Sequence, residues 1–321
     1  MLGYIANRGL QGALLLVLVS FISFAVMLLA PGNAMQTFIN PRMSPEEIAR
    51  AERALGLDKP IPVQYVGWLG NLVQGNFGYS VRNGQSVSEL LRQRAGPTLL
   101  LSLTSFVLVI LIALGIGIYS AARPYSLVDY LSTTLVFVGI SVPSFFFGLL
   151  LIYLFAVRLG WLPTSGFENY NADLQGWPLV FDRIRHMVLP VSVLTLTGLA
   201  SILRHVRSSV GEALRQDYIR TARSKGVSEY RVLTRHALRN GLIPIITLLG
   251  LALPGFFAGS VITETIFAWP GMGRLLVDSV FARDYPVSMA INMITAALVI
   301  LGSLLADILY GFADPRIRFD R

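Results

Sequence analysis

Six long apolar segments alternate with polar connections along the chain. They hold almost no charged side chain away from their ends and cover residues 10–30, 98–122, 130–157, 188–206, 242–263 and 286–310. A helix needs roughly 20 mostly apolar residues to cross the hydrocarbon core of a bilayer, and its backbone polar groups must be satisfied internally there. The pattern therefore predicts an all-α membrane protein with six transmembrane helices.

The connection 31–97 carries two further helical patterns. The tetrapeptide that begins at Ser44 (Ser-Pro-Glu-Glu) is typical of a helix start, with an N-cap serine, proline at the first helical position and acidic residues in the first turn. This helix is predicted to run to Leu57, and a second short helix is predicted from Tyr65 to Val73. We expect the two to form a small helical cap.

The composition indicates that many of the hydrophobic residues face lipid. Hydrophobic residues make up 54% of the 321 residues, charged residues only 14%, and the mean hydropathy is +0.62. A soluble domain of this length needs more charge to cover its surface. The lack of cysteine excludes disulfides, thiolate metal sites and cysteine nucleophiles. The first apolar segment is longer than the apolar part of a signal peptide, so we expect it to remain as an anchor.

The basic residues set the predicted orientation. The formal net charge is +8, but Lys and Arg gather in alternate connections, which favours a membrane protein over one that binds nucleic acid. With a cytoplasmic N-terminus, the cytoplasmic parts hold 14 of the 26 Lys and Arg, nine of them between Arg204 and Arg239. We therefore expect both termini in the cytoplasm and the connection 31–97 on the outside.

The basic segment, residues 207–241, shows two amphipathic helical patterns. The first runs from Arg207 to Lys225 and the second begins at Ser228, with Gly226 between them and Asn240-Gly241 at the end. A long positive loop can simply fold back on the membrane surface. Alternatively, the turn around Gly226 is a docking element, because small residues allow a partner to approach and flanking cations can pair with acidic groups.

Four stretches carry a family resemblance. Asp217-Tyr218-Ile219-Arg220-Thr221-Ala222-Arg223-Ser224-Lys225-Gly226, followed by Arg235-His236-Ala237-Leu238-Arg239-Asn240, resembles the cytoplasmic loop of binding-protein-dependent ABC importer permeases, in particular the oligopeptide/dipeptide family. Stretches 55–80, 267–286 and 314–316 resemble the outer regions and tail of the first membrane subunit of that family. Two departures stand out: Asn33-Ala34 replaces the usual Asp-Pro, and Arg220-Thr221-Ala222 replaces Glu-Ala-Ala.

The resemblance implies a type I ABC importer permease fold and a non-catalytic subunit of an ATP-driven importer. It implies a second homologous permease, two ABC ATPases that hold ATP and Mg, and an extracytoplasmic solute-binding protein, all at a cell (inner) membrane. The chain itself has no Gly-x-x-x-x-Gly-Lys-Ser/Thr loop for phosphate. The implied ATPase-coupling residues are Asp217, Tyr218, Thr221, Ala222, Arg223, Lys225, Gly226, Arg235, His236 and Asn240.

The expected organisation is 1–30 for the cytoplasmic start and first span, 31–97 for the outer cap, and 98–321 for the core permease domain with the coupling loop 207–241. Peptides are the expected solute; glutathione, nickel chelates and some sugars remain alternatives. A secondary transporter is the main rival, but ionisable groups at the bilayer midplane and an internal repeat are not evident. The three histidines lack the spacing of metal ligands, so we expect no metal site.

Candidates for a gate or pathway are Pro143, Ser144, Pro254, Gly255 and Glu264. Each proline would break a span and free backbone carbonyls, although Pro and Gly are also ordinary packing devices in membrane helices. Glu264 could contact a peptide amino group or the binding protein, or could simply pair with Arg274 or Arg283. Asp307 is expected to pair with Arg204 or Arg207.

Overall fold

The computed structural model describes residues 2–29, 46, 59–242, 244, 245, 248, 255–258 and 260–313. This part of the chain is helical apart from turns, loops and one antiparallel bridge between Tyr79 and Ser86. The helices are α1 (Leu2–Leu29), α3 (Ile61–Val73), α4 (Val87–Ala122), α5 (Leu127–Ser141), α6 (Ser144–Leu151), the π-helix η1 (Ile152–Arg158), α7 (Trp177–Leu214), α8 (Asp217–Ser224), α9 (Glu229–Arg231), the π-helix η2 (Val232–Ala237), α10 (Leu238–Gly241), α12 (Gly255–Ala258), α13 (Val261–Ile266), α14 (Met272–Phe281) and α15 (Tyr285–Ala313).

Four helices in the described part are long and apolar enough to cross a membrane: α1, α4, α7 and α15. A fifth candidate is the pair α5 and α6–η1, which is bent by 104° where the predicted third span contains Pro143. Most of the predicted fifth span, 242–263, lies outside the described residues. Five of the six predicted spans thus coincide with apolar helices, one of them broken.

Helix α4 begins eleven residues before the predicted second span, and the expected boundary between cap and core at residues 97 and 98 falls inside it. Pro97 is tolerated within the helix although it cannot donate a backbone hydrogen bond. At 36 residues, α4 extends about 54 Å, well beyond the roughly 30 Å hydrocarbon core. Its first turns therefore belong to a structure outside the bilayer.

Helix α7 likewise continues past the predicted fourth span, to Leu214. The prediction of one separate helix from Arg207 to Lys225 is therefore wrong. Residues 207–214 extend α7, and a short helix α8 begins after the turn at Arg215 and Gln216. The apolar spacing of three and four persists across this turn, which is why the sequence pattern did not reveal the break.

Helices α4 and α7 form the centre of the fold and pack through small residues. A side chain at Gly117 would lie 2.8 Å from a methyl of Val206, and one at Gly198 would lie 3.0 Å from a methyl of Val109. Such positions allow helix backbones to approach closely in a membrane, where packing replaces the hydrophobic effect between helices. Helix α5 joins them through Val136, which packs against Leu199 and its neighbours.

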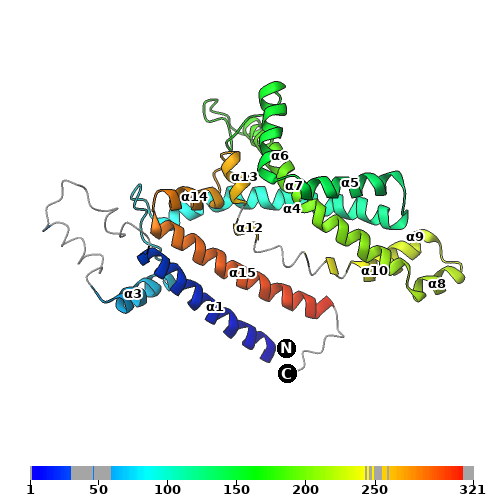
Figure 1. The fold of residues 1–321 in the computed structure, drawn as a ribbon, viewed down its shortest axis with the longest axis horizontal. Coiled ribbons are helices and arrows are strands. Elements are labelled where there is room, and N and C mark those ends of the chain that lie inside the picture. Colours follow the sequence, from blue (N-terminus) through cyan, green and yellow to red (C-terminus); the bar gives the residue numbers. More distant parts are fainter. Residues whose placement is uncertain are drawn as a thin grey trace.

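Helices α1 and α15 lie side by side, with the N-terminal end of α1 beside the C-terminal end of α15 (Figure 1). Gly12 permits this contact, because an added side chain would reach 2.6 Å from Ile300. The short helix α3 confirms the helix predicted at Tyr65–Val73 but starts four residues earlier. Its Tyr65 donates to or accepts from Ser20 on α1, at 2.7 Å, and packs against Phe24. The other predicted cap helix lies outside the described residues, except for helical Glu46.

Candidate functional site

The basic segment (207–241) folds at the opposite end of the α4–α7 pair from α13 and α14 (Figure 1). After α7 ends, α8 turns back, and a loop at 225–228 leads into α9, η2 and α10. Five side chains form its buried core, with Leu214, Val227 and Leu233 packed against them; these are Ala213, Ile219, Ala222, Val232 and Ala237. The segment is therefore a small packed unit with its own interior.

Ala222 belongs to that interior, since only 7% of its surface is exposed. The sequence suggested that its small side chain lets a partner approach. In the structure it faces Ile219 and Val232, so its small size serves the internal packing of the segment. The exposed surface of this segment is formed by its neighbours.

The loop after α8 is held by a left-handed residue and an ion pair. Gly226 has φ +75°, a backbone conformation that favours glycine, and nothing lies within 4 Å of an added side chain. Arg223 donates to both carboxylate oxygens of Glu229, at 2.7 and 3.1 Å. These hydrogen bonds lower the pKa of the Glu229 carboxyl below its ordinary value of 4.5. Arg223 is thus committed to a partner within the chain.

The remaining predicted coupling residues are mostly on the surface. Asp217, Tyr218, Thr221, Lys225, Gly226, Arg235 and Asn240 are exposed, and His236 is half-buried. Asp217 binds Arg220, while the side chains of Lys225 and Arg235 have no hydrogen-bond or ion-pair partner in the described part of the chain. Tyr230, which the sequence analysis did not select, is 77% exposed beside them. An exposed surface of cations and tyrosines is suited to an acidic protein partner.

The helices of the basic segment that follow Leu214, from α8 to α10, are joined to α7 by close backbone contact. Helix α10 ends at Gly241, as the sequence predicted, without a left-handed residue at Gly241 or Leu242. The lack of a side chain at Gly241 allows contact with α7, because an added Cβ would lie 3.1 Å from the Val210 Cα. Val206, Val210 and Ile245 form a buried cluster with residues of α4 next to this contact. Movement of the segment would therefore be passed to α7.

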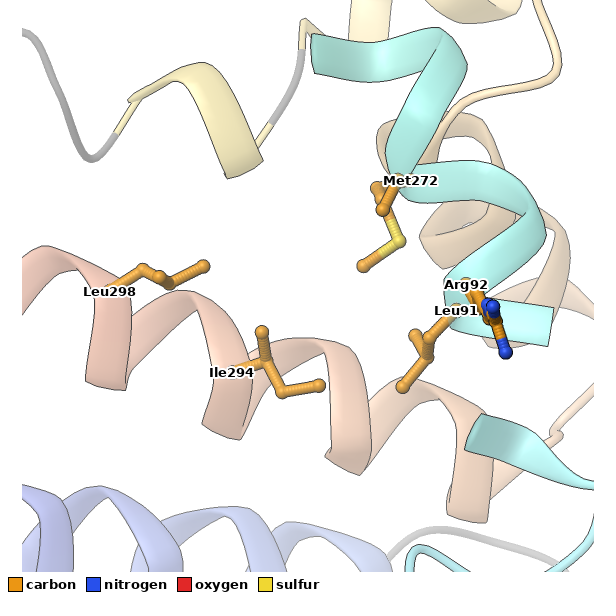
Figure 2. Close-up of a pocket in the computed structure, with 6 residues that line it drawn as sticks. Leu91, Arg92, Met272, Ile294 and Leu298 are labelled. Carbon is orange, nitrogen blue, oxygen red and sulfur yellow. The ribbon is translucent and has the colours of Figure 1, made fainter. Parts of the chain in front are cut away.

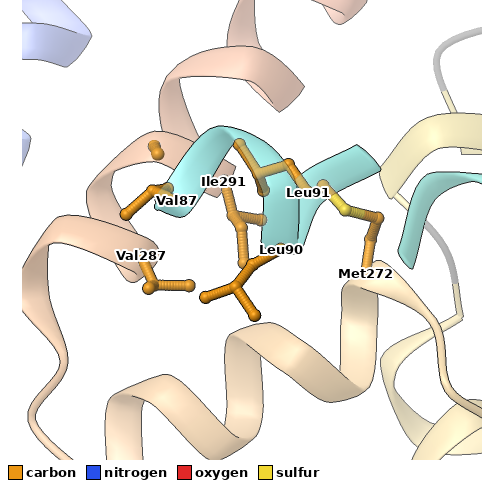
Figure 3. Packing of buried hydrophobic residues seen from close by; sticks show 7 residues of the cluster. Val87, Leu90, Leu91, Met272, Val287 and Ile291 are labelled. Atoms are coloured by element: carbon orange, nitrogen blue, oxygen red, sulfur yellow. The ribbon is translucent and has the colours of Figure 1, made fainter. Parts of the chain in front are cut away.

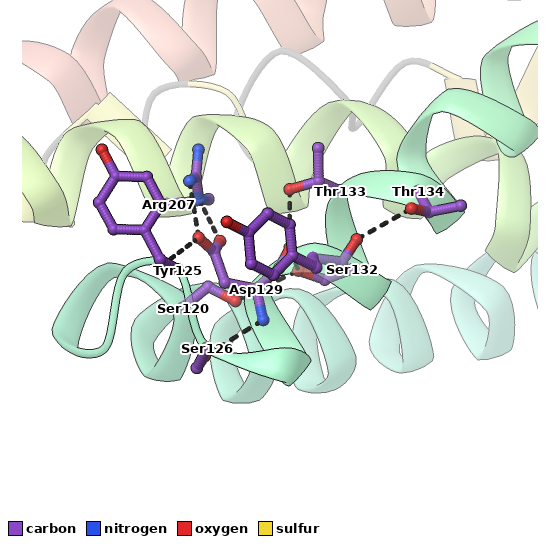
Figure 4. Close-up of polar contacts among 9 residues, drawn as sticks. Ser120, Tyr125, Ser126, Asp129, Ser132, Thr133, Thr134 and Arg207 are labelled. Atoms are coloured by element: carbon purple, nitrogen blue, oxygen red, sulfur yellow. Dashed lines mark hydrogen bonds and ion pairs between the residues drawn. The ribbon is translucent and has the colours of Figure 1, made fainter.

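A second tie joins α7 to α5 (Figure 4). Arg207 donates to both carboxylate oxygens of Asp129, at 2.5 and 2.9 Å, and the backbone N–H of Tyr125 donates to the same group at 3.0 Å. Asp129 is 3% exposed, and Ser126 caps the helix by accepting from its backbone N–H. Arg207 thus binds Asp129, and its expected pairing with Asp307 stays a prediction because the Asp307 side chain lies outside the described residues.

Sequence reasoning missed Asp129. Its position three residues after Ser126, at a helix start, explains only the capping bond. Its partner is 78 residues further along the chain, and no local pattern indicates that distance. The pair places an ionic contact beside the last turns of α7 and thus beside the basic segment.

The pathway candidates are spread over several places. Pro143 caps α6 and Ser144 begins it, at the sharp bend after α5. Pro254 lies outside the described residues, and Gly255 begins the short helix α12 and is exposed. Helix α6, which Ser144 begins, packs against α13, which carries Glu264, and α13 lies at the far end of the bundle from the basic segment.

Glu264 is fully buried, with 0% of its surface exposed. Thr98 donates to it from α4 at 2.9 Å, and the backbone N–H of Arg274 donates to it at 3.0 Å. The expected ion pair with Arg274 is wrong, because the Arg274 guanidinium instead donates to the carbonyl of Ala268 at 2.7 Å. A side chain at Gly271 would overlap the carboxylate.

Trp269 completes this arrangement by donating its indole N–H to the Pro97 carbonyl at 3.0 Å. Thr98 also accepts from the backbone N–H of Met272 at 2.7 Å. We call the set Pro97, Thr98, Glu264, Trp269 and Met272 the buried clasp. It fastens the loop between α13 and α14 onto α4.

Two family models together match nearly the whole chain. The binding-protein-dependent transport system inner membrane component matches residues 113–319, and the N-terminal part of such membrane components matches residues 1–104. The chain belongs to this permease family. It is therefore a multi-pass protein of the inner membrane, and its long apolar helices agree with that placement.

The permease also has close full-length relatives. It is 48% identical to the oligopeptide transport system permease protein AppB of Bacillus subtilis (strain 168), over 99% of this chain and all of the relative. It is 42% identical to the di/tripeptide transport system permease protein DppB of Pseudomonas aeruginosa (strain UCBPP-PA14), over 94% of this chain and 95% of the relative. No group of three or more His, Cys, Asp or Glu able to hold a metal ion occurs among the described residues.

Proposed function

We propose that the permease translocates di- and oligopeptides as one of two homologous membrane subunits of an ABC importer. The names of its relatives support the substrate class, and the family supports a binding-protein-dependent machine. In this proposal two ABC ATPases carry ATP and Mg, an extracytoplasmic binding protein delivers the peptide, and this chain supplies no catalytic group.

We also propose six spans with both termini in the cytoplasm. The antiparallel contact of α1 and α15 supports it, since it brings the N-terminal end of α1 beside the C-terminal end of α15. The basic segment then lies in the cytoplasm, in agreement with the enrichment of Lys and Arg on that side. The buried clasp and α14 lie on the outer side.

The basic segment is the proposed docking site for an ATPase. The observation that carries this role is its construction: a packed unit with an exposed cationic and aromatic face, fixed to α7 at Gly241. ATP-driven closure of the ATPases would shift the segment as a body. The shift would reach α7 directly and α5 through Arg207 and Asp129.

The bend at Pro143 is the proposed place where α5 and α6 change their relative angle during alternating access. Ser144, Pro254 and Gly255 are proposed to line or gate the pathway. Glu264 is proposed to hold α13 and α14 against α4 on the outer side and not to contact the passing peptide. Its hydrogen bonds in the buried clasp support this role.

The lack of cysteine allows a direct test in the natural sequence background. Lys225→Cys should react with a membrane-impermeant maleimide in inverted vesicles only, whereas Asn83→Cys should react in intact spheroplasts only. Lys225→Cys should also form a disulfide with a cysteine placed on the ATPase surface, in a yield that changes with ATP. Labelling of Lys225→Cys from the outside would refute the orientation, and failure to cross-link at any ATPase position would refute the docking role.

A further inference from the structure

A polar hollow of about 390 Å³ lies at the same end of the bundle as the buried clasp. Its walls come from the hairpin 79–86, from α4, from α14 and from the start of α15. Its charged lining residues are Arg82, Arg94, Asp278 and Asp284, and its apolar ones are Leu90, Leu275 and Val287. On the proposed orientation it belongs to the outer side of the permease, where peptide arrives.

The hairpin wall is held in place by Asp284, which is 3% exposed. Its carboxylate accepts from the hydroxyl of Ser80 and, at 3.2 Å, from the backbone N–H of Val81. The hairpin itself is closed by the Ser80 N–H, which donates to the Gln85 carbonyl at 2.8 Å. Both carboxylate oxygens of Asp284 therefore accept a hydrogen bond from the hairpin. These bonds fix this wall of the hollow in place.

Two guanidinium groups in the lining have no hydrogen-bond or ion-pair partner within the described residues: those of exposed Arg82 and half-buried Arg94. The other acidic residue of the lining, Asp278, lies 3.8 Å from Arg274 and shares its charge with that residue. Because both oxygens of Asp284 already accept hydrogen bonds from the hairpin, the two guanidinium groups are the charged groups of the lining that remain available to a ligand. Guanidinium groups bind carboxylates with two parallel hydrogen bonds.

The remaining wall is apolar. Leu90 and Val287 belong to the core cluster that joins α4, α14 and α15 (Figure 3), and Leu275 packs against it. A hollow of this size with apolar walls and a few directed polar groups is typical of a small-molecule site. A peptide end presents the matching chemistry: a carboxylate next to a side chain.

We propose that this hollow is a subsite for the C-terminal residue of the peptide, with Arg94 and Arg82 binding its carboxylate and Leu90, Leu275 and Val287 contacting its side chain. The proposal rests on the proposed peptide substrate and orientation. An acidic side chain of the binding protein has the same carboxylate chemistry. The volume of the hollow, about 390 Å³, matches a peptide end and favours the peptide.

The test uses the assembled transporter in nanodiscs, without binding protein or nucleotide. The probes are tritiated alanyl-leucine and the same dipeptide with its C-terminus amidated. The free acid should bind at least about tenfold more tightly than the amide, as expected for loss of a charge-assisted bidentate contact. Arg94→Gln should weaken binding of the acid about tenfold and leave binding of the amide unchanged, and Arg82→Gln should have a smaller effect of the same kind.

Arg92→Gln is the matched control. Arg92 is two residues away on α4, so it projects from a different face of the helix, and it borders a separate hollow with Leu91, Met272, Ile294 and Leu298 (Figure 2). Its substitution should leave binding of both dipeptides unchanged. Co-purification of the ATPases with each variant verifies that the transporter has assembled.

Three results would overturn the proposal: equal affinity for acid and amide, an equal loss in Arg92→Gln and Arg94→Gln, or no dipeptide binding together with weaker docking of the binding protein in Arg94→Gln. The last would assign the carboxylate to the binding protein. ATP-driven dipeptide uptake by the natural transporter in proteoliposomes, measured in parallel with binding protein present, tests the proposed function separately from the subsite.

Discussion

The two ends of the α4–α7 pair are held by different kinds of interaction. At one end the fully buried Glu264 carboxylate accepts hydrogen bonds from Thr98 on α4 and from the Arg274 N–H in the first turn of α14. At the other end the basic segment has its own small apolar core and exposes most of its charges. The first arrangement resists movement because opening it would leave buried polar groups unpaired, whereas the second can move as a unit while keeping its interior intact.

Glu264→Leu should have the largest effect of the substitutions considered. It leaves Thr98 and the Arg274 N–H without their acceptor in a buried site, so we expect a loss of about 3 kcal/mol in stability. The purified transporter should show a lower temperature of unfolding and poor assembly. Glu89→Leu, at an exposed position of α4, is the control and should change little. Equal stability of the two variants would show that the hydrogen bonds of the buried clasp do not stabilise the fold.

Arg207→Leu should have the next largest effect, because it leaves the buried Asp129 carboxylate with only the Tyr125 N–H as a donor. We expect a loss of about 2 kcal/mol and reduced transport in proteoliposomes. The double variant Asp129→Asn/Arg207→Leu should be more stable than Arg207→Leu alone. If the double variant is no more stable than Arg207→Leu, the ion pair does not hold α5 to α7.

Gly226→Ala should cost about 1 kcal/mol, because alanine is strained at φ +75° although space is available. The loss should be confined to the basic segment and should reduce transport more than thermal stability. Gly211→Ala is the control: this helical glycine of α7 also has open space and an ordinary φ. Hydrogen exchange should rise around residues 222–229 in Gly226→Ala only.

The smallest effect concerns pH. Because Arg223 lowers the pKa of Glu229 below 4.5, the pair stabilises the turn above that ordinary value and the contribution is lost as pH falls through the lowered pKa. The protection factors of amides in the turn, which take account of the intrinsic pH dependence of exchange, should therefore fall at acidic pH in the natural protein. Glu229→Gln should show faster exchange already at neutral pH and no further acid-dependent step.

Exchanging the charges of Arg223 and Glu229 tests whether Arg223 acts within the basic segment. Arg223→Glu breaks the pair, while Arg223→Glu/Glu229→Arg restores it with reversed charges. Recovery of transport in the double variant would show that Arg223 acts within the segment. Persistent loss of transport would show that Arg223 is required for contact with the ATPase.

Much of the architecture was predictable because membrane helices carry their information locally. The long apolar runs marked five helical spans in the described part, and Pro143 marked the break in one of them. The basic segment was recognisable from its charge and helical spacing. Its internal break at Arg215 and Gln216 was not, since the apolar spacing continues across it.

The sequence by itself determined that the chain enters a membrane, which segments form the long apolar helices in the described part, and which segment carries the basic residues. Only the tertiary structure decided that Ala222 faces inward, that Arg207 binds Asp129, and that Glu264 is buried beneath Thr98, which lies 166 residues earlier. The reason is physical: crossing a bilayer requires each segment to satisfy its own backbone, so the pattern is local. A buried side chain instead takes whichever donor the fold brings next to it, however distant along the chain.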